Sequence, residues 1–207
     1  MNKIAFITGG SRGIGRDAAL KLAEQNIDII LTYHRNEKAA LDVVEKIKEK
    51  GQNAFAIQSD IRDITLFDDL VKSLSFVLKE QFGRESFDYL LNNAGTGLHT
   101  SIEETSIDDL DDMLHIHVKR PFFLTQKLLP LIENGGHIVN ISSGLTRFSM
   151  PGSAAYAMAK GAVEVMTRYM AKEFASKGIR VNTIAPGAIA TDFRGGAVRN
   201  SEQVKGM

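Results

Sequence analysis

The sequence predicts an α/β protein built on one doubly wound parallel sheet. Short runs of apolar residues alternate with longer segments of helical periodicity along most of the chain. Continuous apolar runs, rather than alternating ones, are typical of strands buried on both faces, as in parallel sheets. Right-handed crossovers between such strands then give the strand order 3-2-1-4-5-6. We therefore expect a single Rossmann-type domain with helices on both faces of the sheet and no seventh strand.

Six short apolar runs are the expected strands: Ile4–Thr8, Ile27–Thr32, Ala54–Ser59, Phe87–Leu91, Gly136–Ser142 and Ile179–Ala185. Between them, apolar residues recur every three or four positions, so that Ile14, Ala18 and Leu22 fall on one side of the first such segment. The expected helices are Ile14–Gln25, Glu37–Lys50, Thr65–Gln81, Ile107–Leu131 and Ser153–Ser176. Pro121 lies inside the fourth helix and is expected to kink it, because proline has no N–H to continue the hydrogen bonds.

The composition narrows the class of protein. The 207 residues suffice for one domain, expected at 1–193 and followed by a loose polar segment at 194–207. Lys+Arg and Asp+Glu both number 25, so bulk charge favours neither nucleic acid nor a membrane as a partner. The absence of cysteine excludes disulfides and a cysteine nucleophile, and the histidines show no metal-ligand spacing. With no signal-peptide pattern and no apolar run long enough to span a bilayer, we expect a cytoplasmic protein without a metal.

A glycine-rich segment follows the first strand and opens the first helix. It reads Thr8-Gly9-Gly10-Ser11-Arg12-Gly13-Ile14-Gly15. Glycines allow the backbone to turn tightly and to approach a pyrophosphate closely, and the helix N-terminus adds free N–H groups and a partial positive charge. The segment therefore predicts a dinucleotide site; the alternative is a glycine-rich turn without a ligand.

The end of the second strand favours NADP(H), with NAD(H) as the alternative. An acidic residue there would bind the adenosine ribose and favour NAD, but this chain has His34 and Arg35. These basic side chains, joined by Arg12, would pair with a 2′-phosphate; otherwise they are simply solvated. Asp60, after the third strand, is placed to meet the adenine edge. Asn92-Asn93-Ala94-Gly95, after the fourth, suits a backbone passing close to a ribose, although ordinary turn chemistry explains either segment as well.

Tyr156 and Lys160 are candidates for acid–base chemistry. They lie four residues apart on the last expected helix, so they share one face. A cation beside a phenol stabilises the phenolate, and this allows a tyrosine to act as a general acid and base. The spacing alone occurs by chance in many helices, and it gains weight from the glycine-rich segment in the same chain. Ser143, at the end of the fifth strand, could hydrogen-bond the oxygen on which charge develops.

Taken together, these segments resemble the short-chain dehydrogenase/reductase family, and within it the 3-oxoacyl-(acyl carrier protein) reductase-like members. The matching pieces follow the family's order and spacing from Met1 to about Phe193: Thr8-Gly9-x-x-x-Gly13-Ile14-Gly15, Asn92-Asn93-Ala94-Gly95, Ser143, Tyr156-x-x-x-Lys160 and Arg180-Val181-Asn182-x-x-x-Pro186-Gly187. The resemblance implies an NADP(H)-dependent oxidoreductase that interconverts a carbonyl and a secondary alcohol, and that forms a homodimer or homotetramer.

The resemblance also implies a role for each matching position. Tyr156 would exchange the proton with the substrate oxygen, Lys160 would hold the nicotinamide ribose, and Ser143 would orient the carbonyl. The implied cofactor contacts are Gly9, Ser11, Arg12, Gly13, Ile14 and Gly15 to the phosphates, Asp60 and Ile61 to adenine, Asn92, Ala94 and Gly95 to ribose, and Pro186, Gly187, Ile189 and Thr191 to nicotinamide. Leu98, Leu145, Phe148 and Met150 fall where substrate would approach, which hints at a carbonyl with apolar substituents; packing against other residues explains them equally well.

Two departures from the family pattern motivate an alternative function, although the serine–tyrosine–lysine set and the glycine-rich segment favour the reductase. His117 stands where the family has an active-site asparagine that supports a proton relay to the lysine. The histidine either replaces that function, for example by shuttling a proton itself, or weakens the relay, or marks lost activity. The chain also ends before the roughly forty to fifty residues with which family members continue, so the sixth strand is expected to be a sheet edge. The alternative is a non-catalytic nucleotide-binding or scaffold protein derived from such a reductase.

Overall fold

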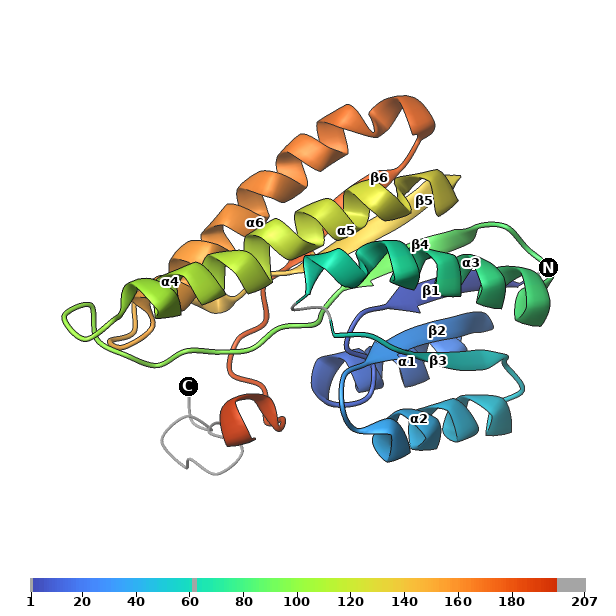
Figure 1. Ribbon diagram of the computed structural model, residues 1–207, viewed down its shortest axis with the longest axis horizontal. Helices are drawn as coiled ribbons and strands as arrows, with labels where there is room; N and C mark the ends of the chain where they lie inside the picture. Colours follow the sequence, from blue (N-terminus) through green and yellow to red (C-terminus); the bar gives the residue numbers. More distant parts are fainter. Residues whose placement is uncertain (1, 61–62, 197–207) are drawn as a thin grey trace.

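The computed structural model describes residues 2–60 and 63–196, and the predicted sheet is present in them (Figure 1). Six parallel strands run in the order β3-β2-β1-β4-β5-β6, which confirms the predicted order. Their bounds are β1 Lys3–Ile7, β2 Ile27–Tyr33, β3 Ala54–Gln58, β4 Phe87–Asn92, β5 Ile132–Ile141 and β6 Arg180–Ile184. A short 3-10 turn, Phe193–Gly196, spans the end of the predicted domain and the start of the predicted loose segment. Residues 197–207 lie outside the described residues, as does the predicted site residue Ile61.

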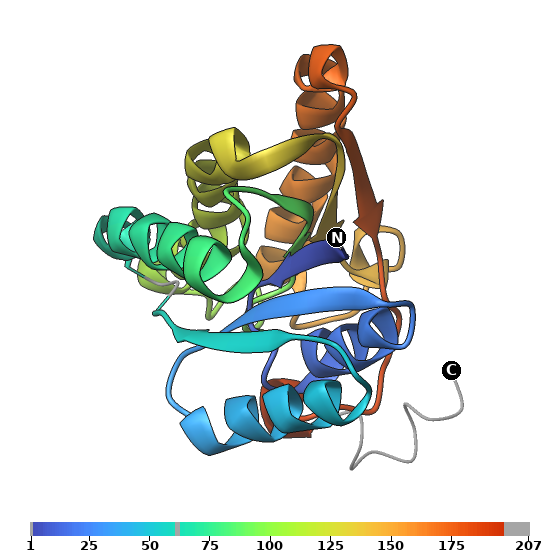
Figure 2. The same cartoon turned by 90° about the vertical axis from the view of Figure 1, so that its right-hand side faces the viewer.

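The helices cover both faces of this sheet. Helices α1 and α2 pack on one face, and α3, α5 and α6 on the other (Figure 2). Their bounds, with that of α4, are α1 Gly13–Ala23, α2 Glu37–Glu49, α3 Phe67–Phe82, α4 Ile107–Leu114, α5 Arg120–Leu128 and α6 Ala154–Glu173. None of the helices in the part of the chain that the structure describes is long and apolar enough to cross a bilayer.

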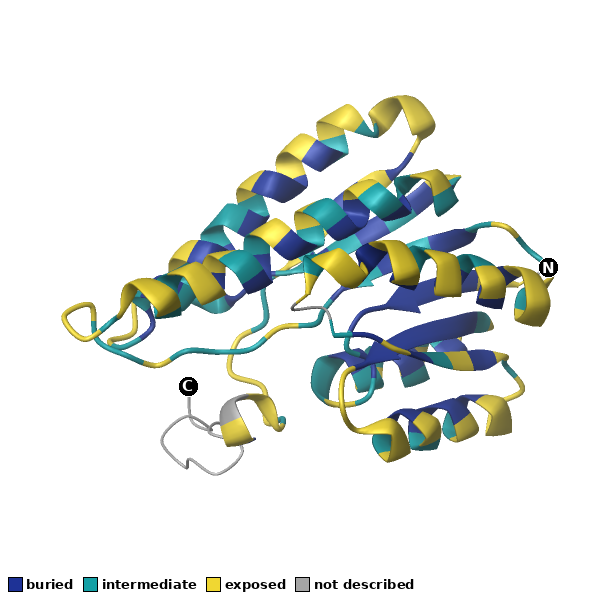
Figure 3. Cartoon of the chain, viewed as in Figure 1, coloured by how far each residue is buried: buried dark blue, intermediate teal, exposed yellow. Residues whose placement is uncertain are grey.

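The first strand shows why the sheet is buried on both sides. Ile4 and Phe6 belong to the hydrophobic cluster beneath α3, α5 and α6, whereas Ala5 and Ile7 belong to the cluster beneath α1 and α2. Side chains alternate between the two faces of a strand, so only a continuous apolar run satisfies both clusters. Buried residues accordingly concentrate in the strands and on the inner faces of the helices (Figure 3).

The long helix expected at Ile107–Leu131 is interrupted earlier than predicted. A turn of π-helix, His115–Lys119, joins α4 to α5 immediately before Pro121. Pro121 cannot donate to the carbonyl of His117, the partner it would have in an α-helix, and the wider turn accommodates this loss. The irregular turn thereby brings His117 into the site described below.

Candidate active site

Helix α6 presents Tyr156 and Lys160 on one face, as the spacing predicted. Lys160 Nζ lies 5.7 Å from the centroid of the Tyr156 ring and donates a hydrogen bond of 2.7 Å to the carbonyl oxygen of Ile141. The lysine is only 5% exposed. Burial lowers the pKa of Lys160 to about 8, because the ammonium group loses solvation. The side chain is therefore a buried cation at neutral pH, placed to stabilise negative charge on the tyrosine.

Of the two adjacent serines, Ser143 is the one left available. The hydroxyl of Ser142 lies 3.0 Å from Glu164 Oε1 and 3.1 Å from the carbonyl oxygen of Lys160, so its proton is engaged by acceptors. The Ser143 hydroxyl oxygen accepts a 3.2 Å hydrogen bond from the Leu145 N–H. No acceptor for the Ser143 hydroxyl is found among the described residues, which leaves its proton to donate to a substrate oxygen.

The glycine-rich segment forms a cradle at the start of α1. Gly9 has a φ of +67°, and a β-carbon there would lie 2.9 Å from that of Ala94. A β-carbon on Gly15 would clash with the Asn93 amide and the Gly9 carbonyl. That amide donates to the carbonyls of Thr8 and Gly9 at 2.9 and 3.0 Å, which holds the turn in place. Only glycine fits this packing, and the resulting shape is that of a pyrophosphate site at a helix N-terminus.

Arg12, Gly13 and Ser11 complete the cradle. Arg12 precedes α1 with an extended backbone and makes no side-chain capping bond to the helix. Gly13, with a φ of +55°, begins the helix. The N-terminal N–H groups of α1 thus meet no capping side chain from Arg12, which suits an anion at this position.

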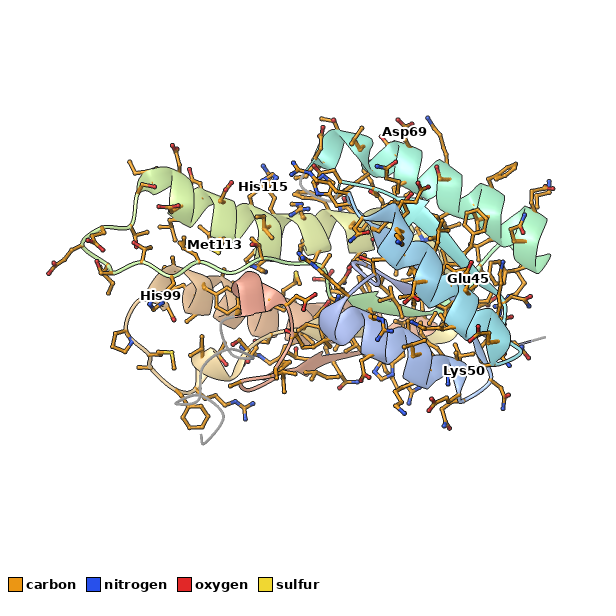
Figure 4. The ribbon with its side chains drawn as sticks, turned by 90° about the horizontal axis from the view of Figure 1, so that it is seen from below. Glu45, Lys50, Asp69, His99, Met113 and His115 are labelled. Atoms are coloured by element: carbon orange, nitrogen blue, oxygen red, sulfur yellow. The ribbon has the colours of Figure 1, made fainter. Side chains whose placement is uncertain are left out.

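A cavity of about 400 Å³ adjoins the ends of β2 and β3. It is lined by His34, Arg35, Gln58, Ser59, Asp60, Leu66, Asp69, Leu70 and Ser73, of which Asp69 on α3 is labelled in Figure 4. His34 Nε2 lies 3.1 Å from a carboxylate oxygen of Asp60. A carboxylate therefore does lie beside the end of β2, although it comes from the end of β3. The cavity combines basic, acidic and amide groups and fits the adenosine end of a dinucleotide.

The segment after β6 returns across the glycine cradle to the tyrosine. Pro186 accepts a 2.8 Å hydrogen bond from the Gly144 N–H, next to Ser143. A β-carbon on Gly13 would lie 3.7 Å from that of Thr191. Ile189, which lies between Pro186 and Thr191 in the sequence, is half exposed. Pro186 and Thr191 thus flank the space between the cradle and Tyr156, as expected for a nicotinamide site.

Phe193 was not among the predicted site residues, yet it lies against the tyrosine. The ring centroids of Phe193 and Tyr156 are 6.1 Å apart and the rings are tilted by 50°. Phe193 is the last residue of the predicted domain, and no local pattern marks it as a site residue. Its place follows only from the path of the chain after β6.

His117 is buried beside Tyr156. The two rings meet edge to face with centroids 5.3 Å apart, and His117 Nε2 lies 2.8 Å from the carbonyl oxygen of Thr96. A carbonyl can only accept, so Nε2 carries the hydrogen. A β-carbon on Gly95 would lie 2.7 Å from His117 Cε1, and glycine at that position therefore makes room for the imidazole.

The surroundings of His117 keep its ring neutral. Burial, and then the nearby charge of Lys160, lower the pKa of His117 to about 3. A group with this pKa takes up almost no proton near pH 7, so a proton shuttle that charges His117 itself is disfavoured. Replacement of the asparagine by position, a weakened relay and lost activity all stay open.

Replacement of His117 by asparagine should reduce the sensitivity of the protein to acid. Because the pKa of His117 is about 3 folded and 6.5 unfolded, the unfolded chain binds more protons between these values, and stability falls as the pH falls through them. Between pH 7 and 5 the resulting loss in the free energy of unfolding is about 2 kcal/mol. Denaturant unfolding at both pH values should show a smaller loss in the His117→Asn variant. Equal losses in the two proteins would contradict the neutral, buried histidine.

The side-chain donor of Asn92 is engaged inside the fold. Asn92 is buried, and its amide nitrogen donates to Asn140 Oδ1 at 2.8 Å and to Thr125 Oγ1 at 3.0 Å. Its Oδ1 has no hydrogen-bond partner among the described residues, and Asn92 lines a small cavity together with Ala94 and Lys160, so a contact to the ribose stays a prediction. The neighbouring Asn93, which the same motif contains, is the residue that holds the glycine cradle.

Comparison with known proteins identifies the family of this chain. A family model described as short chain dehydrogenase matches residues 3–202. The chain belongs to the short-chain dehydrogenase family. This membership confirms both the resemblance and the expectation of an oxidoreductase.

Two relatives of this short-chain dehydrogenase are named as reductases. It is 39% identical over 195 residues to the 3-oxoacyl-[acyl-carrier-protein] reductase FabG of Staphylococcus aureus (strain Mu50), covering 93% of this chain and 77% of the relative. It is 33% identical over 191 residues to the hydroxynaphthalene reductase arp2 of Aspergillus fumigatus, covering 92% of this chain and 68% of the relative.

Solved structures show the same fold. The angucycline C-6 ketoreductase LanV, crystallised with bound NADP, superimposes with a TM-score of 0.91 at 35% identity, covering 98% of this chain and 78% of LanV. The promiscuous reductase LugOII, which catalyses keto-reduction at C1 during lugdunomycin biosynthesis, also gives a TM-score of 0.91, at 38% identity and with coverage of 98% and 79%.

Proposed function

We propose that this short-chain dehydrogenase is an NADP(H)-dependent reductase that converts a ketone into a secondary alcohol, with Tyr156 as the general acid. The observation that carries the proposal is the buried cation of Lys160 beside the Tyr156 ring, with the Ser143 hydroxyl proton free to donate. Both the oxidoreductase family and the NADP bound to the similar structure of LanV support the choice of cofactor.

The residues of the chain divide the chemistry among them. When bound, NADPH supplies the hydride that the carbonyl carbon receives. As negative charge grows on the carbonyl oxygen, the Ser143 hydroxyl donates a hydrogen bond to it and Tyr156 transfers its proton, which gives the alcohol. Lys160 stabilises the phenolate left behind, and a proton from solvent restores the phenol.

The glycine cradle and the neighbouring cavity suggest which residues would contact each part of the cofactor. The cradle formed by Gly9, Ser11, Arg12, Gly13, Ile14 and Gly15 would hold the pyrophosphate, and the cavity with His34, Arg35 and Asp60 would hold the adenosine end. Ala94 and Gly95 would pass close to the ribose near Lys160. Pro186, Gly187, Ile189 and Thr191 would bound the nicotinamide.

Apolar side chains around the site support a substrate with apolar substituents. Phe148 lies over Gly144, next to Ser143, and is 74% exposed, while Phe193 lies against Tyr156. One aromatic ring thus lies near the residue after Ser143, and the other lies beside Tyr156. The FabG and hydroxynaphthalene reductase names of the relatives are consistent with ketones that carry acyl or aromatic groups.

The loop before α6, which carries Phe148, packs against the loop after β4. His99, labelled in Figure 4, lies on the loop after β4, and a β-carbon on Gly152 would clash with its imidazole. The Thr100 N–H donates to the Gly152 carbonyl at 3.0 Å. This contact ties the loop after β4 to the loop before α6 at the mouth of the site.

The test is NADPH oxidation in the presence of a carbonyl panel. We expect turnover with ketones that bear aromatic or long alkyl groups, and slower turnover with acetone. Nicotinamide fluorescence measures NADPH binding separately. Binding without turnover across the panel would favour the alternative of a non-catalytic nucleotide-binding or scaffold protein. Light scattering tests the predicted homodimer or homotetramer, which stays a prediction.

Arg35 is expected to decide between the two nicotinamide cofactors. The Arg35→Ala variant should raise the KM for NADPH about tenfold, equivalent to ~1.4 kcal/mol, because a charge-assisted contact to the 2′-phosphate is lost. The KM for NADH should stay within about twofold. Lys38→Ala, which removes an exposed positive charge on α2 outside the cavity lining, is the matched control. Equal effects on both cofactors, or an equal effect in the control, would contradict this assignment.

A further inference from the structure

One carboxylate on α6 is hydrogen-bonded to two residues near Ser143 in the chain, one before it and one after it. Glu164, one turn after Lys160, accepts hydrogen bonds at Oε1 from the Ser142 hydroxyl at 3.0 Å and from the Thr146 hydroxyl at 2.8 Å. Glu164 is not among the predicted site residues, and the proposed reaction does not use it. Bonds between hydroxyl groups and an ionised carboxylate are stronger than bonds between neutral groups.

The segment from Ser142 to Thr146 is held from its other side by the end of β6 and the residues that follow it. The Ser142 N–H donates to the Ile184 carbonyl at 2.7 Å, and the Gly144 N–H donates to the Pro186 carbonyl at 2.8 Å. Thr146 Oγ1 also lies 2.9 Å from the Ser143 carbonyl oxygen. Ser143 is thus placed between two backbone anchors on the β6 side and the carboxylate on the α6 side.

Two consequences follow for Ser143. The carboxylate holds the helix that carries Tyr156 and the turn that carries Ser143 at a constant separation, because it is part of one and bonded to the other. It also engages the proton of Ser142, so this neighbouring hydroxyl does not compete for a substrate oxygen.

We propose that Glu164 is a positioning residue for Ser143, which sets the place of the serine hydroxyl relative to Tyr156 and leaves Ser143 as the only one of the adjacent serines that donates to substrate. This inference rests on the proposed carbonyl reduction. A small displacement of a group that must meet developing charge lowers the rate strongly, by about 10²-fold for 1 Å. Glu164 acts through Ser143 and touches neither the substrate nor the cofactor.

The decisive variants are Glu164→Gln and Glu164→Leu. Glutamine keeps an oxygen acceptor at the same place, and we expect kcat within about threefold of native; leucine removes the acceptor, and we expect kcat to fall about 10- to 100-fold. The KM for NADPH should not change in either. Glu173→Leu, at an exposed position on the last turn of the same helix, is the matched control and should leave kcat unchanged.

A double-mutant cycle separates positioning from general damage. In a Ser143→Ala background the Glu164→Leu change should lower the remaining kcat by less than about twofold, because the hydroxyl on which Glu164 acts is already absent. If Glu164→Leu folds poorly, Thr146→Val serves instead, because it removes one of the two hydroxyl groups bonded to Glu164 and retains the carboxylate. The loss of kcat in Thr146→Val should then be intermediate. Additive losses, or no rescue by glutamine, would overturn the proposal.

Amide hydrogen exchange distinguishes failure of this inference from failure of the proposed function. If the native protein reduces no carbonyl, the proposed function fails, and exchange at Gly144 and Leu145 decides the positioning claim. Both amides should exchange faster in Glu164→Leu than in the native protein, Glu164→Gln or Glu173→Leu. Unchanged exchange in Glu164→Leu would overturn it.

Discussion

Substitution of Tyr156 by phenylalanine is expected to lower kcat for ketone reduction by about 10²- to 10⁴-fold, the range typical of a lost general acid. The ring contacts with His117 and Phe193 do not require the hydroxyl group, so the substitution leaves the packing in place. The affinity for NADPH should stay within about threefold. Stopped-flow measurement of a single turnover, together with a fluorescence titration of NADPH, checks both expectations.

Tyr169→Phe is the matched control for this experiment. Tyr169 lies on the same helix and is 67% exposed, so the same chemical change is made away from the site. We expect native kcat in this variant. Full turnover in Tyr156→Phe would show that another group donates the proton, and a lost affinity for NADPH would place Tyr156 in cofactor binding instead.

Substitution of Lys160 by methionine is expected to remove activity and to stabilise the fold. The ammonium is almost completely buried, and burial lowers the pKa of Lys160 to about 8. Between about pH 8 and 10.5 the unfolded chain therefore binds more protons than the folded one, and the stability of the native protein rises with pH through this window. Below pH 8 the whole penalty of a buried cation is present.

Methionine fills similar space without charge. At pH 7 the Lys160→Met variant should be more stable than native by about 1–3 kcal/mol, the penalty being partly offset by the lost hydrogen bond to Ile141. The gain should shrink as the pH approaches 10. Activity should fall by at least about 10²-fold at every pH, because no cation remains to stabilise the phenolate.

Denaturant unfolding at pH 7 and 10, with kcat measured in parallel, tests this exchange of stability for activity. Lys172→Met, at an exposed position near the end of α6, is the control and should change neither quantity by a comparable amount. A destabilised but active Lys160→Met variant would contradict both the buried charge and its function.

The buried strands and the Tyr156–Lys160 face could be predicted because both leave a local pattern, and the strand order then followed from the right-handed crossovers between parallel strands. A continuous apolar run such as Ile4–Ile7 requires burial on both faces, and a spacing of four on a helix places two side chains on one face whatever surrounds them. The glycine-rich segment belongs to the same class, because its position between strand and helix can be read from its neighbours.

The different orientations of Asn92 and Asn93 could not be predicted from the motif that contains them. Both stand in one short motif, and nothing local indicates which of them points into the fold. The structure turns Asn92 toward Asn140 and Thr125, and Asn93 toward the glycine cradle. His117 was identified by its position, but its neutral state depends on burial and on the charge of Lys160.

By itself, the sequence determined the parallel α/β fold, the strand order, the dinucleotide cradle and the tyrosine–lysine pair. Only the tertiary structure decided that Phe193 contacts Tyr156, that Glu164 joins Ser142 and Thr146, and that a carboxylate from β3 lies beside His34. The strands, the cradle and the tyrosine–lysine pair are set by residues near each other in the chain, which leave a local pattern, and the strand order follows from the fixed handedness of the crossovers. The second rests on contacts between distant segments, whose geometry exists only once the strands and helices have packed.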